Sequence, residues 1–469
     1  MSEQLPAHLH ERLNRYGQQH LVRWWNELDT AAQRRLIEQI ETIDFARIDR
    51  LFRQQHIAED SDGGSPTANI RPASQVVRLP KEPREHADRA AAGKMGREAL
   101  ASGKVGAILV AGGQGERLGF NYPKGMYPIG PVSDRTLYQI LAEQLLARSR
   151  ECGKAIPYYV MTSDATHVET LEFFRKHKYI GLNATDVCVF RQGNMPAVDK
   201  QTGRILLAEK GAVAMSPDGH GGMLAALAAS GCLDDMRLRG IEYLHYHQVD
   251  NPTTIVCDPA YIGFHILRRA EISTKVVAKR NASESMGVVV SSSGQTRIVE
   301  YIDMPNELKE ATDSEDNLLH WAGNTAIHVF SRRFLDRLVA ENLELPFHLS
   351  AKKVPFIDDA GRLVEPAEAN AYKFERFVFD ALPHASRALV VEADRAREFN
   401  PVKNADGDDS PATARGAMTR IYTDWLRAAG AIVPHGVPVE ISPLFALDAD
   451  GVRDKVPTGK KFDGPVVLK

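Results

Sequence analysis

The sequence lacks several features that would place it in a familiar class of protein. No apolar run approaches the roughly 18 residues that a membrane-spanning helix needs. The first residues are polar and contain no apolar segment of the kind found in secretory signals. Lys and Arg number 58 against 61 Asp and Glu, so a net charge of -3 provides no basic surface for nucleic acid. We therefore expect a cytoplasmic protein that binds neither nucleic acid nor a membrane.

Cysteine is also scarce in this chain. The four cysteines, Cys152, Cys188, Cys232 and Cys257, are far apart and form no Cys-x-x-Cys pair. Their spacing favours neither a zinc ribbon nor a disulfide framework, so we expect reduced residues in the core. A length of 469 residues is enough for about three domains, and no internal repeat divides the chain.

The stretch from Val105 to Leu137 is the most informative part of the sequence. Val105 to Ala111 is short, apolar and rich in β-branched residues, which predicts a buried strand. Four glycines follow this strand: Gly112, Gly113, Gly115 and Gly119. Backbone without Cβ atoms lets N–H groups approach a ligand closely, and Arg117 and Lys124 add two cations. This combination predicts a triphosphate site, although both cations could instead be solvated loop charges.

Two common glycine motifs do not fit this loop. A dinucleotide fingerprint starting at Gly113 needs glycine where Leu118 stands. A P-loop needs Ser or Thr after its lysine, but Gly125 follows Lys124. Neither motif therefore explains the loop.

Hydrophobic periodicity predicts the order of the elements. Residues 6–55 and 84–102 have helical spacing, and residues 59–74 are rich in Gly, Pro and Ser, as expected of a linker. After the glycine loop, a helix over residues 136–150 separates two apolar strands. Strand, helix and strand in this order indicate a doubly wound parallel sheet, which binds ligands at the carboxyl ends of its strands. Residues 373–382 are predicted to be helical.

A later strand, Ile241 to Val249, brings Asp250 to its carboxyl end. A carboxylate at this place suits Mg²⁺, which binds one or two carboxylates together with phosphates and waters. The alternative is an Asp that caps the turn before Asn251 and Pro252. His245 and His247 share one face of the strand and could form a transition-metal site with Asp250, but packing in the core is favoured because no further ligands converge.

Several blocks, taken in order, resemble one known family. GGQGERLG followed by YPKG is similar to the signature of nucleotide-sugar pyrophosphorylases, in particular the UDP-N-acetylhexosamine pyrophosphorylase branch. The similarity continues through MSPDGHGG, YHQVDNP, RIVEYID, AGNTAIHVF, KFERFVFD and FNPVKNADG. It implies an α/β protein with a helical N-terminal domain (1–95), a central Rossmann-like, GT-A-like nucleotide-binding domain (96–410) and a small C-terminal α+β domain (411–469).

The resemblance also implies a reaction and its residues. UTP and a sugar 1-phosphate would give a UDP-sugar and pyrophosphate, with Mg²⁺ as cofactor and Asp250 as its ligand. The implied catalytic residues are Arg117, Lys124 and Lys403. The implied nucleotide-binding residues are Val110, Ala111, Gly112, Gly113, Lys124, Gln192, Gly219, Asp250 and Lys373. The implied sugar-binding residues are His220, Glu300, Tyr301 and Asn324.

Two positions depart from the acetylhexosamine pattern. Glu116 stands where that branch usually has a small hydroxyl residue, and His220 stands where it has Asn. Glu300, Tyr301 and Asn324 follow the acetylhexosamine pattern, which ranks N-acetylglucosamine 1-phosphate first. The alternatives are glucose 1-phosphate, galactose 1-phosphate or a broad range of sugars, and a catalytically silent binding homologue.

Overall fold

The chain forms two compact units, and the computed structural model describes residues 4–60 and 69–469. The first unit comprises Met1–Ala68, Gln192–Met223 and Glu344–Val378, and the second comprises Asn69–Arg191, Leu224–Leu343 and Phe379–Lys469. The chain thus leaves the second unit twice and returns to it twice. The three-domain division from the sequence remains a prediction.

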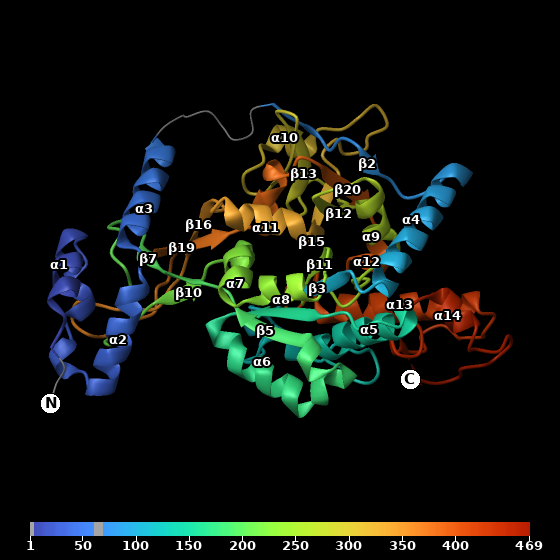
Figure 1. Ribbon diagram of the computed structural model, residues 1–469, viewed down its shortest axis with the longest axis horizontal. Helices are drawn as coiled ribbons and strands as arrows, with labels where there is room; N and C mark the ends of the chain where they lie inside the picture. The colour runs from blue at the N-terminus through green and yellow to red at the C-terminus, as the bar shows by residue number, and fades with distance from the viewer. Residues whose placement is uncertain (1–3, 61–68) are drawn as a thin grey trace. The chain divides into compact units, whose positions relative to one another are not determined.

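The second unit is built on an 11-stranded sheet (Figure 1). Its main path runs β2-β20-β12-β15-β11-β3-β4-β5. These strands are β2 (Val76–Val77), β20 (Ala388–Glu392), β12 (Ile272–Ala278), β15 (Ala322–Ser331), β11 (Tyr243–Gln248), β3 (Val105–Val110), β4 (Tyr158–Thr162) and β5 (Val187–Arg191). Off this path lie β1 (Ile70–Pro72), β13 (Val288–Ser292) and β14 (Gln295–Val299).

Strand direction places the ligand-binding edge of this sheet. Strands β11, β3, β4 and β5 run parallel, as predicted, whereas β15 is antiparallel to both β11 and β12. The chain passes from β3 to β4 and β5 on one side and later adds β11 on the other side of β3. The sheet edge formed by the carboxyl ends of β3 and β11 is therefore a topological switch point, where open α/β sheets bind ligands.

Helices cover both faces of the sheet. On one face, Val105, Ala107 and Leu109 of β3 share a core with residues of α4 (Pro83–Ala101), α5 (Leu137–Cys152), α9 (Pro259–Leu267) and α13 (Pro411–Ala428). On the other face, Tyr159 of β4 donates a hydrogen bond to Asp235 of α8 (Cys232–Leu238) at 2.7 Å. The doubly wound prediction is confirmed.

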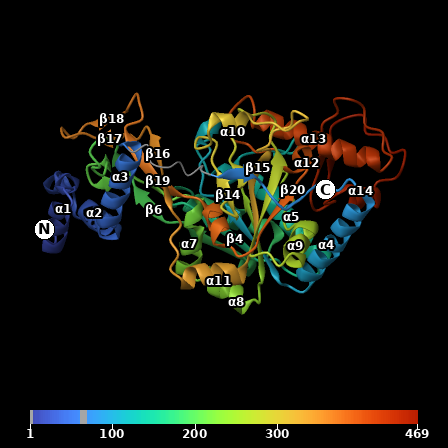
Figure 2. The same ribbon diagram turned by 90° about the horizontal axis from the view of Figure 1, so that it is seen from above.

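Further elements complete the second unit (Figure 2). The C-terminal part contributes β21 (Val439–Ile441), paired in parallel with β22 (Val466–Leu468), and these strands join the same core as α5 and α13. The other helices are α6 (Asp164–Lys176), α7 (Met223–Ala229), α10 (Asn306–Glu310), α11 (Arg332–Ala340), α12 (Arg395–Glu398) and α14 (Ala449–Arg453).

The first unit joins three helices to short strands. As the helical spacing predicts, α1 (Ala7–Arg15), α2 (Thr30–Thr42) and α3 (Phe45–Asp60) occupy the N-terminal part. Their apolar residues, such as Leu9 and Ile40, share a core with Val198 and Phe374 from the other two segments of this unit. The strands are β6 (Asn194–Pro196), β7 (Val198–Asp199), β8 (Leu207–Glu209), β9 (Ala212–Val213), β10 (Met215–Pro217), β16 (Phe347–Lys352), β17 (Phe356–Ile357), β18 (Leu363–Val364) and β19 (Ala371–Arg376).

One predicted helix is wrong. Residues 373–382 form the end of strand β19 and then a 3₁₀ helix over Val378–His384. Buried Tyr372 and Phe374 alternate with Lys373 and Glu375, which is the two-residue period of a strand. Pairing with β16 and β7 then fixes the extended conformation. Within residues 4–60 and 69–469, no helix is both long enough and apolar enough to cross a membrane.

Candidate active site

The glycine loop leaves the carboxyl end of β3 with unsatisfied backbone donors. Ala111 still donates its N–H to Met161 of β4 at 2.8 Å. The next two amides, of Gly112 and Gly113, donate to no acceptor in the part of the chain that the structure describes. A Cβ added to Gly113 would meet nothing within 4 Å, so this backbone faces open space. Such adjacent free N–H groups suit an anion.

The rest of the loop folds back and fixes Lys124. The N–H of Lys124 donates to the carbonyl of Gly113 at 3.0 Å, and the N–H of Gly115 donates to Tyr122 at 3.0 Å. Gly119 has φ 66°, which favours glycine. Gly125 is required for a different reason, because a Cβ there would lie 2.2 Å from the Tyr138 ring. The turn that carries Lys124 is thus packed directly on the core.

Val402 joins Lys124 to Asp250. Its N–H donates to the carbonyl of Asp250 at 2.8 Å, while its own carbonyl accepts from Lys124 Nζ at 3.3 Å. Asp250 follows β11, and Val249 donates to Val110 of β3 at 3.0 Å. The structure therefore brings the glycine loop, Lys124, Asp250 and the residue before Lys403 together at the switch point.

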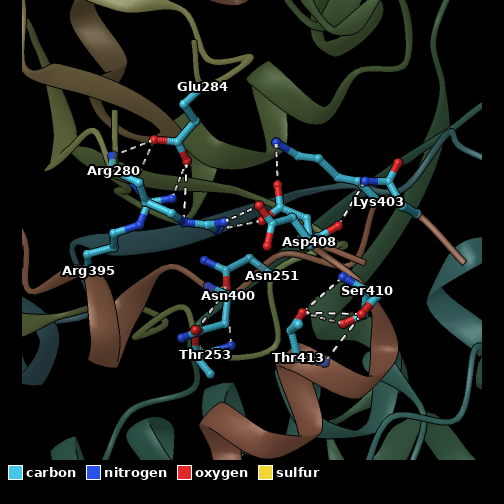
Figure 3. Close-up of polar contacts among 12 residues, drawn as sticks. Asn251, Thr253, Arg280, Glu284, Arg395, Asn400, Lys403, Asp408, Ser410 and Thr413 are labelled. Atoms are coloured by element: carbon cyan, nitrogen blue, oxygen red, sulfur yellow. Dashed lines mark hydrogen bonds and ion pairs between the residues drawn. The ribbon is translucent and has the colours of Figure 1, made fainter. Parts of the chain in front are cut away.

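Lys403 lies in a loop that Arg280 binds through ion pairs (Figure 3). The N–H of Lys403 donates to the carbonyl of Asp409 at 2.6 Å, which closes the loop, and Lys403 Nζ lies 4.0 Å from Asp409 Oδ2. Arg280 pairs with Asp408 at 3.0 Å and with Asp409 at 2.8 Å. Glu284 contacts Arg280 in turn and also pairs with Arg395. Because Arg280 engages the Asp409 carboxylate, Lys403 keeps a loosely paired ammonium group with 39% of its side chain exposed.

Two asparagine side chains, buried Asn251 and half-buried Asn400, connect the Asp250 and Lys403 loops. The Asn251 amide donates to the carbonyl of Glu398 at 2.7 Å, and its oxygen accepts from the N–H of Asn400 at 3.2 Å (Figure 3). Asn400 donates in addition to Thr253 at 3.0 Å. The two loops are thus bound to each other, so the spacing of Asp250 and Lys403 is fixed by the fold.

The predicted sugar-binding residues of the second unit meet around Gly287. The N–H of Asn324 donates to the carbonyl of Gly287 at 2.8 Å, and a Cβ on Gly287 would lie 2.7 Å from Glu300 Oε1. Asn324 also accepts, through its side chain, from the N–H of Ala326 at 3.0 Å. Tyr301 follows Glu300 and is 40% exposed. Glu300 and Asn324 are close to each other, whereas Tyr301 is an exposed turn residue.

The other predicted site residues belong to the first unit: Gln192, Gly219, His220 and Lys373. Within that unit, Asp218 holds the turn that carries Gly219 and His220. It is 2% exposed, pairs with Arg376, and donates its N–H to Gly193 at 2.9 Å, next to Gln192.

The His220 ring is electrically neutral. Burial, with a smaller contribution from His348, lowers the pKa of His220 to about 4. Its Nδ1 accepts a hydrogen bond from the N–H of Val378 at 3.2 Å, and its ring stacks on Phe377 with 5.5 Å between centroids. At neutral pH the side chain therefore offers hydrogen bonding and no charge.

His245 and His247 are packed core residues, as favoured from the sequence. Both are fully buried, and the ring of His247 stacks on Tyr158 with 6.0 Å between centroids. Burial lowers the pKa of His247 to about 3, so the ring stays neutral. Across the described ranges, no three His, Cys, Asp or Glu side chains are grouped so as to hold a metal ion.

Asp250 has the chemistry of a magnesium ligand that acts with a substrate. Its carboxylate is half-buried and makes no hydrogen bond or ion pair with any described residue. A single carboxylate beside an anion-binding loop fits Mg²⁺, since this ion takes its remaining ligands from phosphates and waters.

Sequence reasoning missed the residues that hold the predicted site residues in place within each unit. They are Val402, Asn251, Asn400 and Arg280 in the second unit, and Asp218 and Arg376 in the first. Asn251 and Asn400 carried a signal, since both precede proline in otherwise polar loops. Val402 acts through backbone atoms alone, so its identity carried no signal.

Comparison with known proteins finds sequence similarity over nearly the whole chain. The model of the family described as UTP–glucose-1-phosphate uridylyltransferase matches residues 67–409. UDP-N-acetylglucosamine diphosphorylase 2 from Arabidopsis thaliana is 36% identical over 478 residues, which cover 97% of this chain and 92% of the plant protein. UDP-N-acetylhexosamine pyrophosphorylase-like protein 1 from Homo sapiens is 36% identical over 493 residues, which cover 97% of this chain and 96% of the human protein.

A solved structure is also similar to this chain over nearly its full length. The UDP-N-acetylglucosamine pyrophosphorylase of Trypanosoma brucei, in complex with an inhibitor, matches with a TM-score of 0.82 at 27% identity. The match covers 95% of this chain and 93% of that one. The similarity in sequence and in structure therefore includes both units.

Proposed function

The chain belongs to the UTP–glucose-1-phosphate uridylyltransferase family, and on that premise we propose that it converts UTP and N-acetylglucosamine 1-phosphate to UDP-N-acetylglucosamine and pyrophosphate. Two relatives at 36% identity carry names that refer to UDP-N-acetylglucosamine and UDP-N-acetylhexosamine. Both align over nearly their full length, so the proposal concerns the whole protein.

The observation that carries the proposal is the link through Val402. The backbone of this one residue, directly before Lys403, binds both the Lys124 ammonium and the Asp250 carbonyl. This arrangement lies at the carboxyl ends of β3 and β11, beside the free amides of Gly112 and Gly113. A site of two ammonium groups, one carboxylate and open amides suits a nucleoside triphosphate.

The reaction requires neutralisation of the phosphate charges more than it requires proton transfer. The phosphate of the sugar substrate is already an anion, so its attack on the α-phosphorus of UTP needs no general base. The obstacle is repulsion between two anions, and phosphoryl-type transfer is dominated by positioning and electrostatic stabilisation. In the proposal, Lys124 orients the attacking phosphate and the α-phosphate, Arg117 stabilises the departing pyrophosphate, and Lys403 closes over the site.

Asp250 would hold a magnesium ion in this proposal. When bound, Mg²⁺ would neutralise charge on the phosphate oxygens. Arg117 is exposed and has no partner among the described residues, so its guanidinium can engage a phosphate without breaking an ion pair.

A second sugar, glucose 1-phosphate, is favoured by one residue. His220 replaces the Asn of the acetylhexosamine pattern, and the resulting Gly-His-Gly turn resembles UDP-glucose pyrophosphorylases. Glu300 and Asn324, which meet at Gly287, follow the acetylhexosamine pattern. We rank the acetylated sugar first because two residues of one cluster support it.

A pyrophosphate-release assay tests the proposal. The protein is incubated with UTP, Mg²⁺ and a panel containing the 1-phosphates of N-acetylglucosamine, glucose and galactose. We expect the highest kcat/KM with N-acetylglucosamine 1-phosphate. A higher value with glucose 1-phosphate would reverse the ranking, and no release with any sugar would favour a silent binding homologue.

The variant His220→Asn tests the sugar assignment separately. Asn can accept the hydrogen bond from the N–H of Val378 that Nδ1 of His220 now accepts. We therefore expect the turn to persist and the kcat/KM ratio to move toward the acetylated sugar. An unchanged ratio would remove His220 from the specificity argument.

A further inference from the structure

Two cysteines that are 44 positions apart in the sequence meet in the second unit. The Sγ atoms of Cys188 and Cys232 lie 2.8 Å apart. Two thiols in ordinary packing do not approach so closely, and a disulfide requires about 2.0 Å. Less than 1 Å of movement therefore separates this pair from a covalent bond.

The supporting elements make the contact a property of the fold. Cys188 lies on β5 at the edge of the sheet, opposite Tyr159 of β4. Cys232 begins α8, and Tyr159 donates to Asp235 of this helix. Arg239 then pairs with Asp235 at 2.9 Å and with Asp186, next to β5, at 2.7 Å. The helix is thus attached to β4 through Asp235 and to the residue before β5 through Arg239.

The two thiols have different environments. Cys188 is half-buried, whereas Cys232 is 1% exposed. A hydrogen bond from the Cys232 thiol lowers the pKa of Cys188, against the opposing effect of burial, and the same bond together with burial raises the pKa of Cys232. Because the thiolate is the reactive form and Cys188 is the more accessible residue, Cys188 is the group that an oxidant meets first.

We propose that Cys188 and Cys232 form a redox modification site, in which a hydroperoxide converts the two thiols to a disulfide. The Cys188 thiolate attacks one peroxide oxygen, the O–O bond breaks, and the leaving hydroxide takes a proton to become water. The resulting sulfenic acid on Cys188 is attacked by the Cys232 sulfur, the S–O bond breaks, and a second water leaves. Two thiols lose two electrons and two protons, and hydrogen peroxide is reduced to two waters.

The disulfide would close a loop that contains the whole segment Gln192–Met223. That segment belongs to the first unit and includes Gln192, Gly219 and His220. Closing a long loop restricts the unfolded chain, so oxidation is expected to raise the Tm. Formation of the bond itself does not depend on the function proposed above.

Thiol counting and mass spectrometry test this site. The full chain is treated with hydrogen peroxide, denatured and titrated with a thiol reagent. Its four cysteines are expected to fall to two titratable thiols, with a peptide linking Cys188 to Cys232, a higher Tm, and recovery of four thiols after a dithiol reductant. Four thiols after oxidation, or sulfinic acid at Cys188 without the linked peptide, would overturn the proposal.

Two variants provide the matched comparison. Cys152 is also half-buried, but its sulfur contacts backbone carbonyls, at 3.5 Å from Ser149 and 3.4 Å from Lys154. Cys152→Ser should fall from three thiols to one and keep the Tm rise. Cys188→Ser should keep all three thiols and show no Tm rise. Loss of two thiols in Cys188→Ser would assign the oxidation to other cysteines and refute the site.

Discussion

Replacement of Lys275 by methionine should destabilise the second unit strongly. The Lys275 side chain is 3% exposed and lies between Asp258 and Glu398, which are 8% and 5% exposed. Its ammonium contacts Asp258 at 2.8 Å and also hydrogen-bonds to Glu398. Lys275→Met would leave two carboxylates buried without a counter-charge, so we expect a loss of about 3–5 kcal/mol in the free energy of unfolding.

This loss of stability should depend on pH, because Lys275→Met leaves Asp258 and Glu398 without their counter-charge. In the parent, burial acts to raise the pKa of Asp258, but Lys275 lowers it below its ordinary value. The stability that this ion pair contributes is therefore present at neutral pH and is lost as pH falls through the folded pKa. In Lys275→Met the lowering by Lys275 is gone, and burial is opposed by Arg89 and Arg148, so the pKa of Asp258 rises relative to the parent. Asp258 of the variant should therefore take up a proton at higher pH than Asp258 of the parent, and the difference in stability between the two proteins should shrink as the pH falls.

Guanidinium unfolding followed by circular dichroism at pH 7 and pH 5 measures this difference. Lys104→Met is the matched control, because Lys104 pairs with Glu242 at 3.0 Å while both side chains are more than 40% exposed. The control should change stability by less than about 1 kcal/mol. A loss below about 1 kcal/mol in Lys275→Met, or a loss that does not shrink at pH 5, would refute the reasoning.

Three further variants address the site and the core. Lys124→Ala should lower turnover about 10²–10³-fold in the pyrophosphate assay, and turnover within threefold of the exposed control Lys176→Ala would remove Lys124 from catalysis. Gly125→Ala should cost about 1–3 kcal/mol in thermal or chemical unfolding, because the new Cβ would lie 2.2 Å from the Tyr138 ring; an unchanged midpoint would contradict that packing. Burial lowers the pKa of His247 to about 3, so as the pH falls the unfolded chain binds the proton first. Between about pH 6.5 and the folded pKa, this residue alone should remove about 1.4 kcal/mol of stability per pH unit. His247→Phe should flatten that slope, and an equal slope in both proteins would contradict it.

Local patterns in the sequence predicted the glycine loop and its place. Val105–Ala111 and the glycines after it are contiguous, so strand, turn and ligand edge follow from neighbouring residues. The strand that carries Lys373 was misassigned because its extended conformation depends on pairing with β16 and with β7, and β7 is distant along the chain.

The assembly of the site could not be predicted in the same way. Lys124 and Val402 are separated by 278 positions, and their contact uses a backbone carbonyl that every residue has. Asp218 and Arg376, which form a part-buried ion pair, are 158 positions apart, so hydrophobic periodicity cannot predict their contact either. Cys188 of β5 and Cys232 of α8 come together only in the folded chain, so the spacing of the cysteines in the sequence could not predict their contact.

The discontinuous first unit has a consequence for synthesis on the ribosome. Its N-terminal helices emerge early, but Tyr372 and Phe374, which help to cover their apolar faces, are translated more than 300 residues later. At about 5–20 residues per second this delay is on the order of tens of seconds. During that time the nascent chain carries exposed Leu, Ile and Phe side chains, and a chaperone that binds apolar segments would find its target there.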